Sequence, residues 1–368
     1  MIEKIHIQNF KSIYDLELEV GRVNLFIGEN GSGKSNLLEA LVFVSASESN
    51  MLANEFLVSR GLRVPEPSFM RGAFIGEYTY DADIVIKTYF TNDNEKEFIF
   101  HNDNNEYEEW KVDIDYFNVY GNDEYEYKYK EEKDNRRRPE RKREIKKFLK
   151  NFIIFSPENT ALRVFQKEGQ IQPLGINGEG LLKLLKVINN YEDKSYINTI
   201  IESLQLFNWF ENITIPTNTS SLENTIKIKD KYLYEEFDQR SANEGFLFIL
   251  FYITLLVAKE TPKAFAIDNI DASLNPKLCT KLITILTDLA KKYDKQIFLT
   301  THNPAILDGI DLKDQEQKLF VVSRKKSTGY TRTREITVEN KPKSATDQPL
   351  KLSEAFLRGY LGGLPKGF

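Results

Sequence analysis

The stretch Gly28-Glu-Asn-Gly-Ser-Gly-Lys34-Ser35 decides the fold of this chain, because it fits the pattern GxxxxGK[ST] at every fixed position. Residues 23–27, directly before it, form a short apolar run that is typical of a strand buried on both faces. Residues 36–46, NLLEALVFVSA, have the pattern of a helix. A strand, a glycine-rich loop and a helix in this order predict a P-loop. The alternative, a chance glycine loop before a helix, leaves the flanking strand unexplained.

The spacing of the loop assigns a role to its residues. Its glycines let backbone N–H groups turn inward around phosphates, and the positive end of the following helix points at them. Lys34 reaches the β- and γ-phosphate oxygens, and the Ser35 hydroxyl binds Mg²⁺. We therefore expect ATP and Mg²⁺ as cofactors. The expected nucleotide contacts from this region are Asn30, Gly31, Ser32, Gly33, Lys34, Ser35 and Asn36.

A carboxylate ligand for Mg²⁺ is expected after residues 264–267, AFAI, which form another apolar strand. Asp268 follows at the carboxyl end of this strand, the edge at which open α/β sheets bind ligands. Ser35 and Asp268 are therefore the predicted metal ligands. The alternative is a strand that ends in a capping Asp.

Asn269 occupies the next position, where many ATPases of this build carry a Glu that deprotonates the attacking water. An amide orients water but does not accept its proton at neutral pH. Asp271 lies two residues further on and is a candidate substitute. We therefore expect slow or conditional hydrolysis. An engineered trap is an alternative, although the usual inactivating change is Glu to Gln. The expected catalytic residues are Lys34, Asp268, Asn269, Asp271 and His302.

Two further segments are candidates for the phosphate site. His302 follows the apolar residues 296–300, and a histidine at a strand end can hydrogen-bond a γ-phosphate and sense its loss. A capping or loop histidine is the alternative. The segment Asn243-Glu244-Gly245 precedes the apolar stretch 246–258, and the N-terminus of such a helix binds anions. Asn243 also suits a helix cap, and the two roles are compatible.

Composition restricts the class of protein. Hydrophobic residues make up 41% and charged residues 29% of the 368 positions, a balance that allows a core and argues against global disorder. The net charge of −5 disfavours a general polyanion binder. Cys279 is the only cysteine, which excludes an intramolecular disulfide. The start has no signal-peptide pattern, and the longest apolar run, 13 residues, is too short to span a bilayer, so we expect a soluble, cytoplasmic protein.

Strands alternate with helices from residue 245 onward, which predicts a parallel sheet, and alternation of apolar and polar residues over 75–120 predicts antiparallel strands. Residues 178–210 have a helical pattern. The expected fold is an α/β P-loop NTPase with a mixed or parallel sheet core, an antiparallel β lobe and an inserted helical and charged segment. The expected domains are 1–75 with the P-loop, 76–240 as an inserted lobe with a charged segment at 121–147, and 241–368 as the second part of the ATPase head.

These motifs, in this order, resemble the heads of ABC-type ATPases, a group that includes RecF, SMC proteins and the OLD-like, AAA-labelled ATPases of bacterial defence systems. In that resemblance GENGSGKS is Walker A, AFAID is Walker B, residues 271–276 are the D-loop and His302 is the switch histidine. The opening IEKIHIQNFKSI is similar to the first strand pair of the group. Residues 156–163, 173–185 and 357–365 look like segments of stand-alone ATPase subunits of antiphage systems such as Septu and PARIS.

The resemblance implies a homodimer or higher homo-oligomer, in which each P-loop meets the Asn243–Gly245 segment of another head. ATP then holds the heads together, and its hydrolysis or release opens them. The chain departs from the group in its signature, Ala242-Asn-Glu-Gly245 in place of LSGG, and in Asn269. It also ends about 45 residues after Ser323 without a TOPRIM nuclease domain, so we expect any nuclease to be a separate protein. Gln172 and Glu158 are the candidates for a Q-loop residue.

Residues 136–147, RRRPERKREIKK, form a strongly basic segment with several tyrosines just upstream. Basic residues beside aromatic ones suit contacts to a nucleic-acid backbone and stacking on bases. The alternative is a solvated segment that pairs with nearby acids. The candidate nucleic-acid contacts are Arg136, Arg137, Arg138, Arg141, Lys142 and Arg143.

Two functions fit these features. The first is a nucleotide-gated ATPase that regulates a separate effector, such as a nuclease or toxin, in antiphage defence. The second is a RecF- or SMC-like ATPase that acts directly on DNA in repair or recombination. A transporter ATPase is disfavoured, because about 200 residues separate the P-loop from Asn243 and because Asn269 would cripple a pump. We expect no membrane partner.

Overall fold

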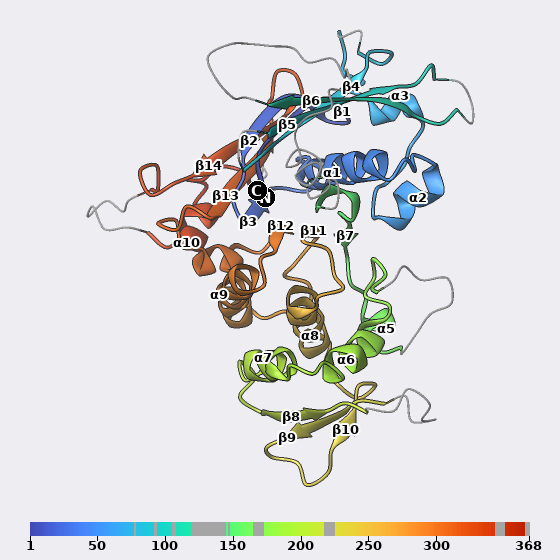
Figure 1. The fold of residues 1–368 in the computed structure, drawn as a ribbon. Helices are drawn as coiled ribbons and strands as arrows, with labels where there is room; N and C mark the ends of the chain where they lie inside the picture. The colour runs from blue at the N-terminus through green and yellow to red at the C-terminus, as the bar shows by residue number, and fades with distance from the viewer. Residues whose placement is uncertain are drawn as a thin grey trace.

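The computed structural model describes residues 1–76, 79–91, 94–104, 108–118, 145, 148–164, 173–216, 225–342 and 350–364. The basic segment 136–147, apart from residue 145, and Gln172 lie outside these residues, so the interpretations placed on them stay predictions. The described elements stack in layers (Figure 1). A five-stranded sheet covers helix α1 (Lys34–Glu48), a six-stranded sheet lies on the other side of that helix, and further helices and a three-stranded sheet follow.

The six-stranded sheet positions the predicted nucleotide site. Its spatial order is β14-β13-β3-β12-β11-β7. All neighbours in it are parallel except β14, which pairs antiparallel with β13. The strands are β3 (Val23–Ile27), β7 (Ile154–Phe155), β11 (Ala264–Ile267), β12 (Gln296–Thr301), β13 (Gln317–Arg324) and β14 (Thr331–Ile336). The structure confirms the parallel core and adds the antiparallel edge strand β14.

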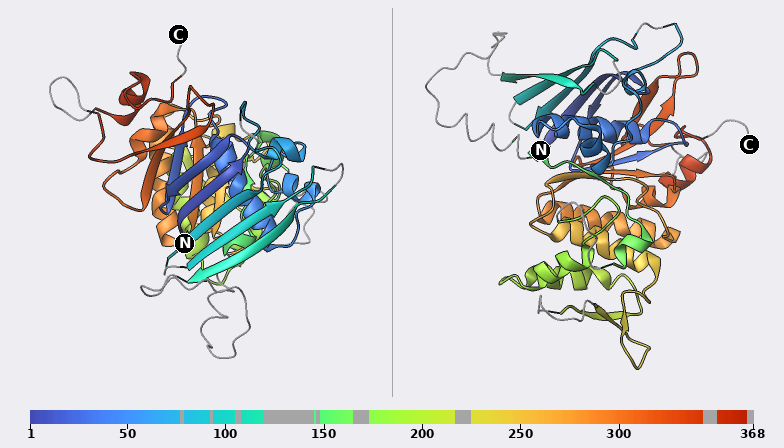
Figure 2. Two further views of the ribbon diagram at one scale, coloured as in Figure 1. Left: turned by 90° about the horizontal axis from the view of Figure 1, so that it is seen from above. Right: turned by 90° about the vertical axis from the view of Figure 1, so that its right-hand side faces the viewer.

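Helix α1 is enclosed between two sheets, and 13 of its 15 residues are buried. Its upper cover is the antiparallel sheet β2-β1-β4-β5-β6, seen from above in Figure 2. That sheet joins strands from both sides of residue 75. Its strands are β1 (Ile2–Phe10), β2 (Ile13–Glu19), β4 (Ile84–Phe90), β5 (Asn94–His101) and β6 (Lys111–Asn118). The antiparallel lobe expected over residues 75–120 is therefore present.

Two buried carboxylates fix α1 to its surroundings. Glu48 pairs with Lys96 of β5, and both side chains are almost fully buried. Glu39 pairs with Lys11 at 2.5 Å and with Arg63 at 2.6 Å. Because an unpaired charge in such a position would cost several kcal/mol, these pairs tie the helix to the outer sheet and to the segment after α2 (Asn54–Ser59) and before α3 (Pro67–Met70).

The opposite face of the six-stranded sheet is covered by helices around α8 (Glu244–Val257), which is apolar on all sides and buried from Phe246 onward. Its neighbours are α5 (Asn159–Leu162), α6 (Leu181–Asn189), α7 (Ser195–Leu204) and α9 (Pro276–Lys292). Beyond them lies the sheet of β8 (Phe210–Thr214), β9 (Lys227–Asp230) and β10 (Phe237–Asp238), as the right-hand view of Figure 2 shows. Among the described residues, no helix combines the length and apolar character needed to cross a membrane.

The helical pattern over 178–210 is correct only in part. It contains α6 and α7, but the chain leaves the helix after Leu204 and enters β8 at Phe210. Phe210 is fully buried and packs with Trp209 and Phe246, so the contact of aromatic rings with α8 overrides the local helical period.

Candidate functional site

The glycine-rich loop leaves β3 and begins α1 at the carboxyl edge of the six-stranded sheet. Gly31 and Gly33 have φ angles of 73° and 104°, which are left-handed conformations that favour glycine. A Cβ on Gly33 would also lie 2.1 Å from the Thr331 hydroxyl oxygen. The Ser32 hydroxyl is buried and has no hydrogen-bond partner. This loop therefore fits a phosphate group, which would supply the missing acceptor.

Lys34 lies inside the loop and is almost fully buried. Its Nζ donates to the carbonyl oxygens of Gly28 at 2.9 Å and of Glu29 at 3.0 Å. Burial lowers the pKa of this amine to about 8, although Asp268, Asp271 and Glu29 act in the opposite direction. The amine is thus held at the mouth of the loop by two neutral acceptors that phosphate oxygens can replace.

Ser35 and Asp268 meet at the start of α1. Asp268 follows β11, which lies beside β12 in the sheet, and its Oδ2 accepts a hydrogen bond of 3.1 Å from the Ser35 hydroxyl. Its other oxygen accepts from the Thr300 hydroxyl. No group of three or more His, Cys, Asp or Glu suited to a metal is found among the described residues. One hydroxyl and one carboxylate fit Mg²⁺, which keeps waters and takes phosphate oxygens as its other ligands.

Asn269 stands exposed at the tip of the turn after β11. Its φ of 56° is left-handed, a conformation that Asn tolerates better than most residues, and its backbone N–H donates to the Thr300 hydroxyl at 2.9 Å. Asp271 is turned toward β12, where its Oδ1 accepts from the Thr301 hydroxyl at 2.6 Å. Its charge acts on Lys34, so the Asp271 carboxylate lies near the phosphate loop.

His302 comes directly after β12, whose last residue Thr301 pairs with Ile27 of β3. The register therefore sets His302 beside Gly28, and the His302 backbone N–H lies 3.4 Å from Asp271 Oδ1. Burial, and next the charge of Lys34, lower the pKa of His302 below its usual 6.5. At neutral pH the ring is therefore neutral, with one nitrogen as donor and the other as acceptor.

The segment Asn243–Gly245 forms the start of α8. The exposed Asn243 caps the helix, because its Oδ1 accepts from the Phe246 N–H at 2.8 Å. Within the described residues, no hydrogen bond or ion pair joins this segment to the P-loop of the same chain. Gly245 instead packs against the D-loop, where an added Cβ would lie 3.1 Å from the Ser273 carbonyl oxygen.

Arg163, at the end of α5, holds the chain just before this segment. Its guanidinium donates to the carbonyl oxygens of Gln239 at 3.0 Å, of Arg240, and of Ala242 at 2.7 Å. Its Nε donates to Asn159 at 2.9 Å. The sequence did not predict this role, because every residue carries a backbone carbonyl and the acceptors of Arg163 therefore form no sequence pattern.

A hydroxyl pair beneath the loop was also missed. Ser12 and Thr331 lie 2.7 Å apart, and Thr331 donates to the Ser32 carbonyl oxygen at 3.1 Å. Asn36 donates to the Ser12 hydroxyl at 2.6 Å, whereas Asn30 is exposed. Ser12 falls in the opening NFKSI. The resemblance of this segment indicates the family but assigns no role to the Ser12 hydroxyl. Thr331 belongs to no motif.

An open cavity of about 610 Å³ adjoins the first turn of α1. Lys11, Ser12, Asn36, Arg63 and Arg324 line it together with Phe74. The Arg324 guanidinium donates to the Gly31 carbonyl oxygen at 3.1 Å, so this concave surface is continuous with the P-loop. Of the two Q-loop candidates, Glu158 is exposed three residues after β7, the strand beside β11.

Comparisons with known proteins agree with this geometry. A family model described as "AAA domain, putative AbiEii toxin, Type IV TA system" matches residues 23–308, more than half of the chain. Among curated proteins, the uncharacterized protein MJECL10 of Methanocaldococcus jannaschii is 46% identical over 67 residues, 17% of this chain and 31% of that protein. The DNA replication and repair protein RecF of Listeria welshimeri is 42% identical over 55 residues, 15% of each chain. This chain therefore spans less than a third of the length of these relatives.

Solved structures give the fold. The crystal structure of an SmcHead bound to the C-winged helix domain of ScpA matches with a TM-score of 0.62 over 92% of this chain and 98% of that chain, at 15% identity. The chain thus has the fold of an SMC head, an α/β P-loop NTPase of the ABC-ATPase type with parallel and antiparallel sheets.

Proposed function

Because the chain belongs to the AAA-domain family that its residues 23–308 match, we propose that it binds ATP with Mg²⁺ and uses the nucleotide to join two copies of itself. It is an ATPase of the SMC, RecF and AAA type. The single observation that carries the nucleotide part of the proposal is the contact of the Ser35 hydroxyl with Asp268 at 3.1 Å. When bound, Mg²⁺ supplies charge neutralisation at the β- and γ-phosphates.

The residues around this contact divide the work of binding. Lys34 donates to the phosphate oxygens in place of the Gly28 and Glu29 carbonyls. Backbone N–H groups of residues 30–36 surround the phosphates, and Ser32 donates its free hydroxyl. His302, neutral at pH 7, donates to or accepts from the γ-phosphate side of the site.

Dimer formation is supported by the lack of any described contact between the Asn243–Gly245 segment and the P-loop of the same chain. The segment offers an exposed helix start. The ABC-type fold resembles heads in which this segment meets the nucleotide of a second subunit. Each composite site would then need two chains.

Hydrolysis is proposed to be slow or conditional. Asn269 holds the position after the Walker B Asp, and its amide orients water without accepting a proton. Asp271 carries the nearest alternative carboxylate, but its Oδ1 is engaged by Thr301. Bound ATP would therefore persist long enough to act as a signal.

The biological role we propose is control of a separate effector, such as a nuclease or toxin, in antiphage defence. The support is the resemblance of residues 156–163 and 173–185 to stand-alone ATPase subunits of such systems. The test is plating of phage on cells that carry this gene with its neighbouring genes. Protection that disappears with Lys34→Ala supports the role, whereas equal plating with and without the genes removes it.

Dimerisation has its own test in vitro. Mass photometry of the full chain is expected to show dimers with ATP and Mg²⁺ and monomers with ADP. Ser241→Arg places a bulky charge at an exposed position two residues before the segment and should abolish the dimers, while ATP binding by the monomer continues. Monomers under all nucleotide conditions would remove the dimer proposal and leave nucleotide binding intact.

The second candidate is direct action on DNA, which the similarity to RecF favours. The solvent face of the outer sheet opposes it. Its five strands carry eight exposed or half-buried carboxylates but only three such lysines. The carboxylates are Glu3, Asp15, Glu17, Glu19, Glu95, Glu97, Asp113 and Asp115, and the lysines are Lys4, Lys87 and Lys111. Such a face repels a phosphate backbone. Salt-dependent DNA binding that is lost when the Lys and Arg of residues 136–147 are changed to Ser would favour this second function.

A further inference from the structure

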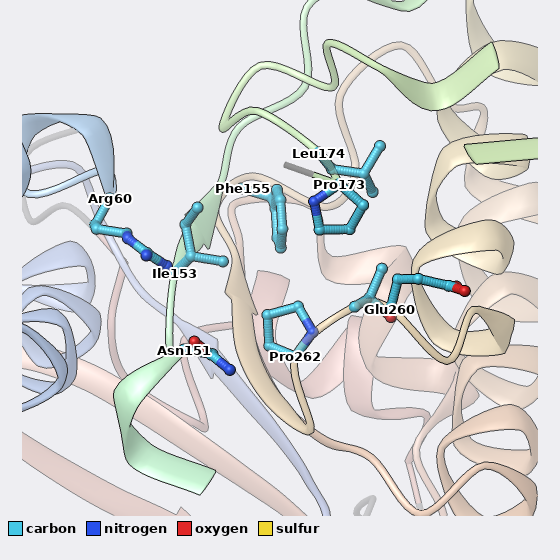
Figure 3. A pocket seen from close by; sticks show the side chains of 9 residues that line it. Arg60, Asn151, Ile153, Phe155, Pro173, Leu174, Glu260 and Pro262 are labelled. Carbon is cyan, nitrogen blue, oxygen red and sulfur yellow. The ribbon is translucent and has the colours of Figure 1, made fainter. Parts of the chain in front are cut away.

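A second cavity, of about 120 Å³, lies at the outer edge of the six-stranded sheet, beside β7 (Figure 3). Its walls come from the end of α2, from residues 151–155, from Pro173–Leu174 and from residues 260–262. Arg60 lies at one side of it and Glu260 at the other, as Figure 3 shows. None of these side chains has a role in nucleotide binding.

Arg60 is the unusual member of this wall. Its Nε is buried without a hydrogen-bond partner, and no ion pair or hydrogen bond of its guanidinium is found among the described residues. Its guanidinium carbon lies 4.9 Å from the centre of the Phe56 ring. Burial lowers the pKa of Arg60, and no nearby acid opposes this effect.

A partly buried guanidinium normally has an anionic partner, because taking it out of water without one is costly. Other partly buried guanidinium groups among the described residues have oxygen acceptors, which are backbone carbonyls for Arg163 and carboxylates in two further cases. Arg63, three residues further on, binds Glu39, and Arg22 binds Asp294 and Glu316. Arg60 faces a cavity instead of an acid, which indicates that its partner is a bound anion.

The other walls restrict the chemistry of that anion. Ile153, Phe155, Leu174 and Pro262 give the cavity an apolar middle. Glu260 at the far side accepts a hydrogen bond from the Tyr191 hydroxyl, and this carboxylate disfavours a second anionic group there. We propose that this cavity binds a small monocarboxylate with an apolar body, whose carboxylate pairs with Arg60.

The position of the cavity connects it to the metal ligands. Phe155 lines the cavity, and its carbonyl oxygen accepts a hydrogen bond of 2.9 Å from the backbone N–H of Asp268. A ligand held against β7 therefore lies one strand away from the carboxylate that meets Ser35. This inference does not depend on dimer formation or on a defence role.

The test uses the full chain and 4,4,4-trifluorobutyrate as the probe, followed by ¹⁹F NMR. The wild type should broaden the probe signal in a saturable manner, and unlabelled butyrate should restore the narrow line. Trifluorobutyramide, which has the same body without the charge, should stay narrow. Arg60→Gln should abolish the broadening, whereas Arg358→Gln, at an exposed arginine paired with Glu354, should leave it unchanged.

Two readouts separate ligand binding from a structural role of Arg60. Arg60→Gln should melt no earlier than the wild type without ligand, since it removes a buried charge that has no partner, and it should still be stabilised by ATP. Equal broadening by the acid and the amide, or by wild type and Arg60→Gln, would overturn the proposal. If Arg60→Gln does not fold, failure of butyrate to displace the probe from wild type is the overturning result.

Discussion

The Ser35 hydroxyl donates a hydrogen bond of 3.1 Å to Asp268, although 233 positions separate the two residues in the chain. The contact exists because β3 and β11 lie on either side of β12 and end at the same edge of the sheet. It brings together the two oxygen ligands that the sequence motifs predict for Mg²⁺. The site is therefore built by the sheet.

Removal of this pair should uncouple ATP binding from Mg²⁺. With Asp268→Asn we expect the enhancement of ATP affinity by Mg²⁺ to fall by about 100-fold, the scale of losing one preorganised charged group. Ser35→Ala should act in the same direction, and Ser35→Thr, which keeps the hydroxyl, should behave as wild type. Titration calorimetry with Mg²⁺ and with EDTA measures the effect. An unchanged Mg²⁺ dependence in Asp268→Asn would contradict the assignment.

Hydrolysis should respond to the residue at position 269. Asn269→Glu and Asn269→Asp both supply a base, and we expect ATP turnover to rise by about 100-fold, the lower end of the usual effect of a general base. Because position 269 has a φ of 56°, Glu should also lower the stability of the fold by about 1 kcal/mol, while Asp tolerates this conformation. Phosphate release and thermal melting give the two measurements. Rapid turnover by the wild type would refute the proposal of slow hydrolysis.

ATP affinity should fall as pH rises above 8. Only the protonated amine of Lys34 attracts phosphates, and burial lowers its pKa to about 8. Between pH 8 and 9 the protonated fraction of the amine falls about fivefold, so the affinity should fall by about the same factor, whereas a lysine with an ordinary pKa would hold its charge until about pH 10. Binding should also take up protons, which calorimetry in buffers of different ionisation enthalpy detects. Lys34→Arg keeps its charge over this range and should show a flat profile.

Arg163 should matter for the dimer and not for the monomer. It holds three carbonyl oxygens just before Asn243, so Arg163→Met should loosen this segment while leaving the P-loop intact. We expect ATP-dependent dimerisation to weaken by about tenfold, which corresponds to the loss of one charged hydrogen bond. Arg163→Lys should restore part of it. A variant that loses monomer ATP binding to the same extent would show a general defect and would contradict this role.

Local patterns predicted much of this fold, and long-range contacts account for the rest. The P-loop, Asp268 and α9 are marked by short motifs and by apolar periods. Ser12 and Thr331 are 319 residues apart and no motif links them, so only the folded chain brings their hydroxyls together. Phe210 lies in a strand because its ring packs against Phe246 of α8. The residues next to Phe210 in the sequence do not predict this contact.

The two buried ion pairs of α1 fix the helix to the outer sheet. At 15 residues it is about 22 Å long, with the P-loop at one end and the Glu48–Lys96 pair near the other. Since Glu48, Lys96 and Glu39 are buried, α1 cannot slide or turn against the outer sheet without breaking a buried ion pair. Any movement of α1 on nucleotide binding would therefore carry the outer sheet and its acidic surface with it.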